Sequence, residues 1–252
     1  MFIRESSSSS SSDSTLKRPI FQGKSRGHLT WIGGPMGSKK SIELIGYMER
    51  YDIGKWSVLG ISHIFENRSL TGSGEREQFD FKKNKTHRYR VWNEHSLIYP
   101  HIKDIQGSIQ SRSGIAYPCV QLETLMPFIM LPEVLANVDV FGIDEFQFFP
   151  DGLEAVAYLL NHHKIVITAG LDADFSADPF RLPTSYYAYT DLVAWAKDVI
   201  KLKAVCMQCS QFDAVFSERM SKKEELVVVG DTETYLAKCH NCYTHPTEKG
   251  CV

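Results

Sequence analysis

The apolar positions in the first quarter of the chain predict a strand, a loop, a helix and a second strand. Residues 29–33 form a short apolar run that is typical of a buried strand. In residues 41–51 the apolar side chains fall at nearly helical spacing, and these side chains are Ile42, Leu44, Ile45 and Met48. Residues 56–61 predict a second strand. This succession is the opening of a βαβ unit, so it favours a parallel sheet.

Two later apolar runs extend the same pattern. Residues 138–143 predict one strand, and residues 165–169 predict another. Between them, Asp151 and Glu154 have the spacing of a capping box, which predicts a helix that continues through Leu160. We therefore expect an α/β protein with a central parallel sheet flanked by helices.

Changes in composition divide the chain into four parts. Residues 1–27 are rich in serine and then basic, and we expect a disordered tail. Residues 28–201 hold the α/β pattern, residues 202–243 are expected to form a small second module, and residues 244–252 to form a flexible tail. Within the α/β part, residues 71–106 are polar with interleaved basic and aromatic side chains. Such a stretch could bind single-stranded nucleic acid, but a surface insertion or extended hairpin is the favoured interpretation.

Length, charge and hydropathy narrow the class of protein. At 252 residues the chain suits one ordinary domain with a small addition. Its net charge of -2 gives no indication of a nucleic acid or membrane partner, and we expect neither. No apolar run approaches the roughly 20 residues that span a bilayer, and the serine-rich start lacks the apolar core of a secretory signal. We therefore expect a cytoplasmic location.

A nearly complete phosphate-binding loop follows the first strand. The pattern G-x-x-x-x-G-K-[ST] fits the segment with Lys40 and Ser41 in the positions that contact phosphate and Mg²⁺, while Lys39 stands where the pattern has its second glycine. Backbone N–H groups of such a loop surround a phosphate, and a Cβ atom at Lys39 could crowd it. The candidate nucleotide ligands are Gly34, Pro35, Met36, Gly37, Ser38, Lys39, Lys40 and Ser41.

An acidic pair follows the predicted strand 138–143. Asp144 and Glu145 come directly after the apolar run, as in a Walker B strand, whose aspartate contacts Mg²⁺ directly or through water. The adjacent Glu145 could act as a general base on an attacking hydroxyl. Together with the phosphate loop about 100 residues upstream, this pair indicates a nucleotide site.

Two C-x-x-C pairs near the C-terminus predict a metal site. Each pair can bind one tetrahedral Zn²⁺ with both sulfur atoms, and two pairs complete a site of four cysteines. Four cysteine ligands leave no open position, so we expect a structural rather than a catalytic zinc. The candidate ligands are Cys206, Cys209, Cys239 and Cys242. The remaining cysteines, Cys119 and Cys251, are expected to be plain thiols.

Five segments together resemble the type II (cytosolic, zinc-containing) thymidine kinases. They occur in the order found in that family, and they are residues 34–41, 143–151, 169–175, 201–209 and 235–242. The resemblance implies a P-loop-type parallel sheet with a small zinc-ribbon-like C-terminal domain, whose zinc holds a lasso loop. It also implies transfer of the γ-phosphate of ATP, bound with Mg²⁺, to the 5′-hydroxyl of thymidine in nucleotide salvage.

The resemblance further implies roles for individual residues. Glu145 takes the place of the general base, and Asp144 that of the acid beside the metal. Glu66 and Arg68 match a D-x-R motif near the transferring phosphate, which makes Arg68 a second candidate catalytic residue, and Gln147 is a candidate on the nucleotide side. The candidate thymidine contacts are Met36, Phe148, Leu171, Phe175, Phe180 and Tyr235, with Leu226, Val227, Val228, Val229 and Gly230 of the lasso loop.

Two functions agree with these residues. The leading hypothesis is an active thymidine kinase, and the alternative is a nucleoside-binding pseudokinase of the same fold. Two departures from the family pattern are expected on the phosphate side, namely Lys39 and the bulky Phe146 after Glu145. They favour the alternative, whereas the presence of Glu145 favours the enzyme. The resemblance also implies a homo-oligomer, either a dimer or a tetramer.

Overall fold

The computed structural model describes residues 27–64, 106–111, 114–220 and 235–245. Several predictions from the sequence therefore lie outside the described residues. These are the serine-rich tail, nearly all of the 71–106 insertion, the C-terminal tail, the candidate residues Glu66 and Arg68, and the lasso residues 226–230.

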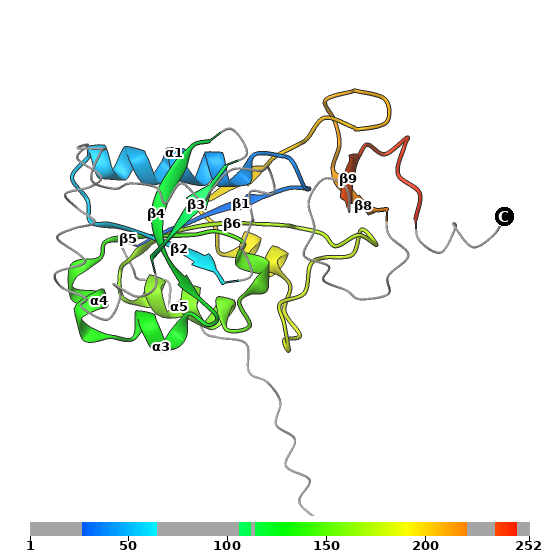
Figure 1. The fold of residues 1–252 in the computed structure, drawn as a ribbon. Helices are drawn as coiled ribbons and strands as arrows, with labels where there is room; N and C mark the ends of the chain where they lie inside the picture. The colour runs from blue at the N-terminus through cyan, green and yellow to red at the C-terminus, as the bar shows by residue number, and fades with distance from the viewer. Residues whose placement is uncertain (1–26, 65–105, 112–113, 221–234, 246–252) are drawn as a thin grey trace, which may run out of the picture.

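A seven-stranded sheet forms the centre of the protein, in the strand order β3-β4-β2-β5-β6-β1-β7 (Figure 1). All neighbouring strands are parallel except β3, which is antiparallel to β4. The sequence prediction of an α/β fold with a largely parallel sheet is confirmed. The strands are β1 (Leu29–Gly33), β2 (Val58–His63), β3 (Gln106–Gln110), β4 (Ala116–Leu122), β5 (Val140–Ile143), β6 (Ile165–Gly170) and β7 (Asp198–Lys201).

Helices cover both faces of this sheet. One face carries α1, and the other carries α3, α4 and α5 (Figure 1). The helices are α1 (Lys40–Ile53), α3 (Met126–Ile129), α4 (Pro132–Asn137) and α5 (Gly152–Asn161), with short 3₁₀ turns η2 (Phe146–Phe148) and η3 (Tyr189–Ala194). Among the described residues, no helix combines the length and the apolar character needed to cross a membrane.

Strands β5 and β6 are almost entirely apolar because both of their faces are buried. In β5, Val140 belongs to the core on the α1 side, whereas Phe141 and Ile143 belong to the core on the side of α3, α4 and α5. The same alternation occurs in β6, where Val166 and Ile167 face opposite cores. Continuous apolar runs therefore identified these strands in the sequence.

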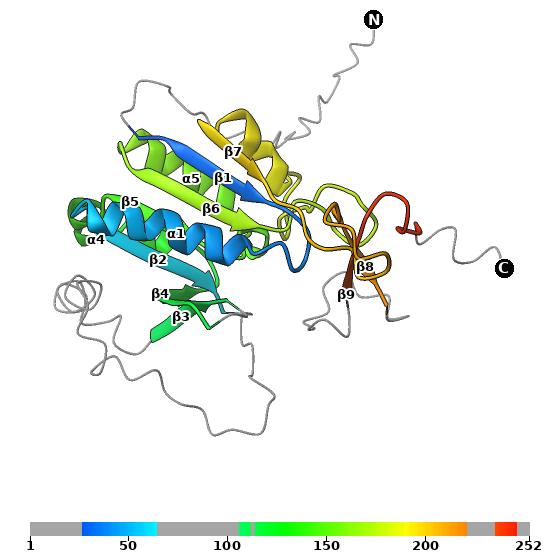
Figure 2. The same ribbon diagram turned by 90° about the horizontal axis from the view of Figure 1, so that it is seen from above.

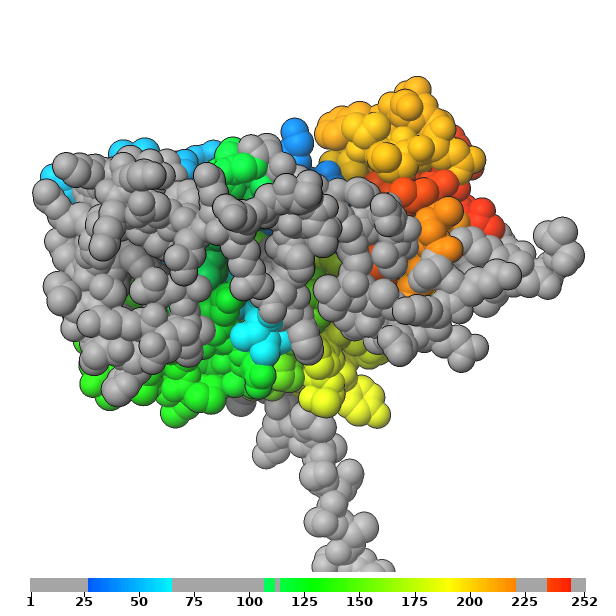
Figure 3. Space-filling view, viewed as in Figure 1, coloured from blue at the N-terminus to red at the C-terminus, as the bar shows by residue number. Residues whose placement is uncertain are grey.

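A second, two-stranded antiparallel sheet consists of β8 (Phe216–Arg219) and β9 (Tyr235–Lys238). It lies beyond the carboxyl ends of β1 and β6 (Figure 2). We call the described residues 204–220 and 235–245 the C-terminal module. In the space-filling view these residues, orange to red, gather at one end of the molecule (Figure 3).

One local prediction is wrong. Asp151 was expected to cap α5, but its side chain makes no capping hydrogen bond to that helix. Its carboxylate instead accepts hydrogen bonds from the backbone N–H groups of Leu125 and Met126, at 2.9 and 2.7 Å. These groups belong to the start of α3, whose free N–H groups attract a carboxylate just as those of α5 would. Asp151 therefore ties two helices on the same face of the sheet.

Candidate active site

The loop after β1 turns tightly and leads directly into α1. The N–H of Ser38 donates to the carbonyl of Pro35 at 3.3 Å, and the ammonium of Lys40 donates to the same carbonyl at 2.9 Å. The Ser38 hydroxyl is buried, and its oxygen has no hydrogen-bond partner among the described residues. A buried hydroxyl without a partner is unusual, so this loop retains an unused polar group of the kind that a bound ligand satisfies.

Lys39 adopts the backbone conformation that glycine would supply at its position. Its φ of 66° and ψ of 29° lie in the left-handed region, and its carbonyl accepts the N–H groups of Ile42 and Glu43 in the first turn of α1. A side chain in this region costs about 1–2 kcal/mol. Gly34 has a different constraint, since a Cβ atom there would lie 2.7 Å from the carbonyl oxygen of Leu202. The loop therefore has a left-handed turn at Lys39 directly before α1.

The acidic pair lies at the carboxyl end of β5. Asp144 is almost fully buried, and its N–H donates to the carbonyl of Ile61 at 2.8 Å. Glu145 is half-buried and left-handed, with a φ of 50° and a ψ of 41°. Its Oε2 accepts a hydrogen bond from Nε2 of Gln147 at 2.7 Å, while Oε1 of Gln147 accepts the N–H of Leu171 at 3.0 Å. Strained backbone at a carboxylate is a feature that clusters at functional sites.

The sheet order brings these segments to one edge. Strand β6 pairs in parallel with β1 on one side and with β5 on the other. The phosphate loop follows β1, the acidic pair follows β5, and Leu171 follows β6, so all three leave the sheet at its carboxyl edge. Ligands of open parallel sheets bind at this edge.

Aromatic side chains extend the site beyond the acidic pair. Phe148, on η2, makes an edge-to-face contact with Phe180, with ring centroids 6.1 Å apart. On its other side Phe148 lies 5.8 Å from the ring of His63, which is buried at the end of β2. Burial lowers the pKa of His63, although a hydrogen bond to the Glu123 backbone and the carboxylates of Glu123 and Glu145 oppose this change.

The C-terminal module contacts the same edge of the sheet. The N–H of Met36, in the phosphate loop, donates to the Ser217 hydroxyl of β8 at 2.9 Å. The guanidinium of Arg219 lies 4.2 Å from the ring centre of Phe175 and donates to the Tyr235 hydroxyl at 2.9 Å. Met36 therefore contacts β8 at Ser217, and Phe175 and Tyr235 both contact Arg219 two residues further along the strand.

The Phe175 backbone provides a further link to the module. The hydroxyl of Tyr243 donates to the carbonyl of Phe175 at 2.8 Å. Burial, with the charges of Asp174, Glu218 and Asp178, raises the pKa of Tyr243 to about 12, so this hydroxyl stays protonated as a donor.

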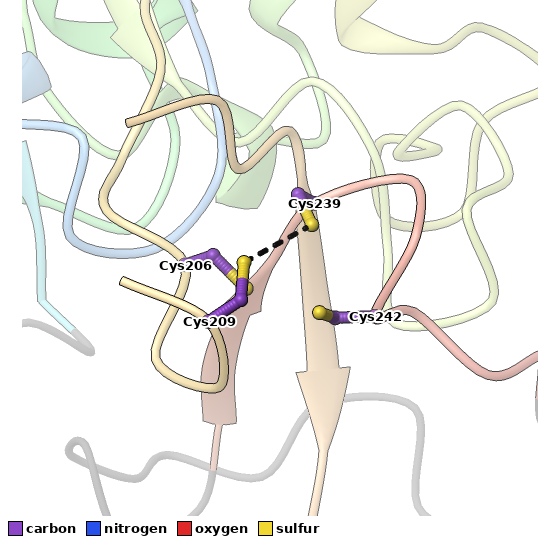
Figure 4. A group of neighbouring side chains, drawn as sticks. All are labelled: Cys206, Cys209, Cys239 and Cys242. Atoms are coloured by element: carbon purple, nitrogen blue, oxygen red, sulfur yellow. Dashed lines mark hydrogen bonds between the residues drawn. The ribbon is translucent and has the colours of Figure 1, made fainter. Parts of the chain in front are cut away.

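The four predicted cysteine ligands come together in the module (Figure 4). Their sulfur atoms all lie within 4.8 Å of one another, and the sulfur atoms of Cys209 and Cys239 are 3.7 Å apart. A tetrahedral metal with bonds of 2.3 Å to sulfur has sulfur–sulfur edges of about 3.8 Å, so the cluster fits one such ion. Burial opposes ionisation of Cys206, but backbone N–H groups of Cys209, Cys239 and Gln208 lower the pKa of its thiol to about 6. A thiolate is the form that binds metal.

Comparisons of the sequence with known proteins agree with the site described above. A family profile described as "Thymidine kinase" matches residues 84–243. Thymidine kinases of vaccinia virus (strain Ankara) and monkeypox virus are each 31% identical over 217 residues, which cover 86% of this chain and 97% of each relative. The thymidine kinase of raccoon poxvirus is 29% identical over the same length.

The chain belongs to the thymidine kinase family. The profile match includes Asp144, Glu145 and all four cysteines, and the alignments to the viral enzymes cover most of the chain. The resemblance inferred from the sequence is therefore confirmed for the family. The roles of individual residues in this thymidine kinase stay predictions.

Phe146, one of the expected departures from the family, does not lie on the phosphate side of the structure. Phe146 was expected to be a departure on the phosphate side, but its ring is fully buried in the core and lies 5.1 Å from the ring of Tyr189. It also fills the space beside Gly152, where a Cβ atom would lie 2.6 Å from the ring. The bulky residue after Glu145 is thus a core residue, which removes one argument for the pseudokinase alternative.

Three residues of the site were not predicted from the sequence. They are His63 at the end of β2, and Ser217 and Arg219 on β8. They become part of the site only through tertiary contacts: His63 with Phe148, Ser217 with the Met36 N–H, and Arg219 with Phe175 and Tyr235. No sequence motif or regular spacing of residues identifies His63, Ser217 or Arg219 as part of the site.

Proposed function

We propose that the protein transfers the γ-phosphoryl group of ATP to the 5′-hydroxyl of thymidine. Membership of the thymidine kinase family supports the substrate and the reaction. The observation that carries the proposal is the arrangement at one sheet edge, where the left-handed phosphate loop and the pair Asp144–Glu145 lie on the two sides of β6.

Each side chain has a role in this proposal. The loop N–H groups and Lys40 would bind the phosphates of ATP, and Ser41 and Asp144 would hold Mg²⁺, which neutralises charge on the phosphates when it is bound. Glu145 would accept the proton of the 5′-hydroxyl as that oxygen attacks the γ-phosphorus. The new oxygen–phosphorus bond replaces the bond to the β-phosphate, and ADP leaves.

Lys39 is compatible with this function on conformational grounds. Its backbone already has the left-handed geometry that the phosphate-loop glycine provides, and its side chain is exposed rather than packed inside the loop. We therefore propose that the loop binds phosphate with lysine at this position.

We also propose that the four cysteines bind zinc as a structural ion. The closed set of four sulfur ligands and the sulfur–sulfur distance of 3.7 Å both favour a metal that prefers thiolates in a tetrahedron. A homodimer or tetramer and a cytoplasmic location, both expected from the sequence, are further proposals. Light scattering of the purified protein would measure the oligomeric state.

Product formation tests the proposed reaction. Purified protein would be incubated with ATP, Mg²⁺ and thymidine, and the products would be separated by chromatography. We expect thymidine 5′-monophosphate and ADP in equal amounts, and no transfer to 5′-deoxythymidine, which lacks the accepting hydroxyl. Thymidine binding without any product would instead support the pseudokinase alternative.

A further inference from the structure

Gln147 is a polar residue in a fully buried position next to Glu145. Its exposed fraction is 0%, and it lies on η2 directly behind the acidic pair. Both ends of its amide have protein partners: Nε2 donates to Oε2 of Glu145 at 2.7 Å, and Oε1 accepts the N–H of Leu171 at 3.0 Å. Gln147 therefore connects Glu145, the proposed general base, to Leu171, the first residue after β6.

The two partners fix the orientation of this amide. If it flipped, an oxygen would face the Glu145 carboxylate and an NH₂ group would face the Leu171 N–H, so both hydrogen bonds would be replaced by repulsions. Gly170, at the end of β6, also leaves room for the amide oxygen of Gln147. A Cβ atom at Gly170 would lie 2.6 Å from Oε1 of Gln147, so the absence of a side chain there accommodates the bridge.

The bridge has a direct consequence for Glu145. Its left-handed backbone is strained, and a hydrogen bond to its carboxylate helps to hold the side chain in one direction.

We propose that Gln147 is a positioning residue, which orients the Glu145 carboxylate to receive the 5′-hydroxyl proton. This role differs from the nucleotide contact expected from the sequence, and it rests on the proposed kinase function. Gln147 acts through Glu145 rather than on a substrate. Its loss should therefore lower kcat while leaving KM nearly unchanged.

Two variants separate orientation from packing. Gln147→Met keeps the length of the side chain but removes both hydrogen bonds, and we expect kcat to fall about 10- to 100-fold with KM for ATP within about twofold. Gln147→Glu keeps an acceptor for Leu171 but sets a second carboxylate against Glu145, so it should also lower kcat with KM for ATP nearly unchanged.

Thr168→Val is the matched control. Thr168 is fully buried in β6, and its hydroxyl accepts a hydrogen bond from Tyr189 at 3.1 Å. The control removes a buried hydrogen bond in the same sheet without contact to Glu145, so it should lower the melting temperature but leave kcat within about twofold of the wild type. Zinc content and circular dichroism would establish that each variant is folded, and Gln147→Glu supplies the test if Gln147→Met does not fold.

The outcomes distinguish this inference from the proposed function. If the wild-type protein does not phosphorylate thymidine, the proposed function fails. If the wild type is active but Gln147→Met and Gln147→Glu keep the wild-type kcat, the positioning role is refuted. A fall in kcat as large in Thr168→Val as in the Gln147 variants would also contradict it.

Discussion

The α/β part and the C-terminal module are stabilised in different ways. On the two faces of the large sheet, buried clusters contain bulky side chains such as Trp31, Phe141 and Tyr189. The buried cluster of the module consists of small residues, which are Ala204, Cys206, Ala214, Ala237 and Cys239. At about 0.8 kcal/mol per buried methylene-sized group, such residues supply only a few kcal/mol. A structural zinc contributes roughly 10–16 kcal/mol in small peptides.

This difference indicates which part of the site depends on the metal. The phosphate loop and the acidic pair are built on strands with a large apolar core, whereas Ser217, Arg219 and Tyr235 belong to the module with the small one. The module nevertheless contacts the loop through Met36 and the chain after β6 through Phe175. Loss of the metal should therefore affect thymidine binding more than the chemistry at the phosphate.

The largest expected effect comes from removing a metal ligand. Cys239→Ser should reduce zinc from about one ion per chain to near zero, because three sulfur ligands no longer complete the tetrahedron. KM for thymidine should rise about tenfold or more, with a smaller change for ATP. Cys119→Ser is the control, since Cys119 is a buried thiol in β4 outside the cluster. Normal zinc content or normal thymidine affinity in Cys239→Ser would contradict the metal-dependent module.

A cavity in the large core should affect the other region. Phe141→Ala removes a fully buried ring of β5 and should lower the free energy of unfolding by about 3–5 kcal/mol. Urea titration followed by tryptophan fluorescence measures this change, because Trp31, Trp56, Trp92 and Trp195 all lie outside the module. Zinc content should stay at the wild-type value in the folded variant. Loss of zinc from the folded variant would show that the C-terminal module depends on the core of the large sheet, which would contradict separate stabilisation of the two regions.

A smaller effect is expected at the contact between the regions. Ser217→Ala removes the acceptor of the Met36 N–H, a hydrogen bond worth about 1 kcal/mol, so KM for thymidine should rise about fivefold with zinc unchanged. Ser217→Thr keeps the hydroxyl and is the matched control. Equal KM values for the two variants would mean that this hydrogen bond does not couple the loop to the module.

The smallest effect concerns the pH dependence of the α/β part. Burial lowers the pKa of His63 in the folded protein, so the unfolded chain binds a proton first as the pH falls through about 6.5. The unfolding free energy should therefore decrease on acidification, and His63→Phe should make this decrease smaller. Urea titrations at several pH values, followed by tryptophan fluorescence, measure both proteins. An unchanged slope would exclude His63 as a contributor.

The sequence predicted those parts of the fold that continuous apolar runs identify. The run 29–33 corresponds to β1 residue for residue, and 165–169 is one residue short of β6. Strands β3 and β4 were not predicted, because Gln106–Gln110 is mostly polar and Ala116–Leu122 contains Pro118. Of these two, β3 lies at the edge of the sheet, whereas β4 is an internal strand between β3 and β2.

The candidate site was predictable where residues close in sequence carry the chemistry. The loop, the acidic pair and the cysteine pairs are such local patterns. The Gln147 bridge joins η2 to the residue after β6, and the Met36–Ser217 hydrogen bond joins the loop after β1 to β8. Both therefore depend on how the strands are arranged in space. Asp151 shows the same limit, because its partners at Leu125 and Met126 are distant in sequence.

Turnover by the Glu145→Gln variant tests the central claim most directly. The amide is nearly the same size as the carboxylate but cannot accept the 5′-hydroxyl proton, so kcat should fall about 100-fold or more. Affinities for ATP and thymidine, measured by calorimetry, should stay within about threefold of the wild type. Loss of kcat with intact binding is the result we predict, and a Glu145→Gln variant that phosphorylates thymidine at the wild-type rate would contradict the account.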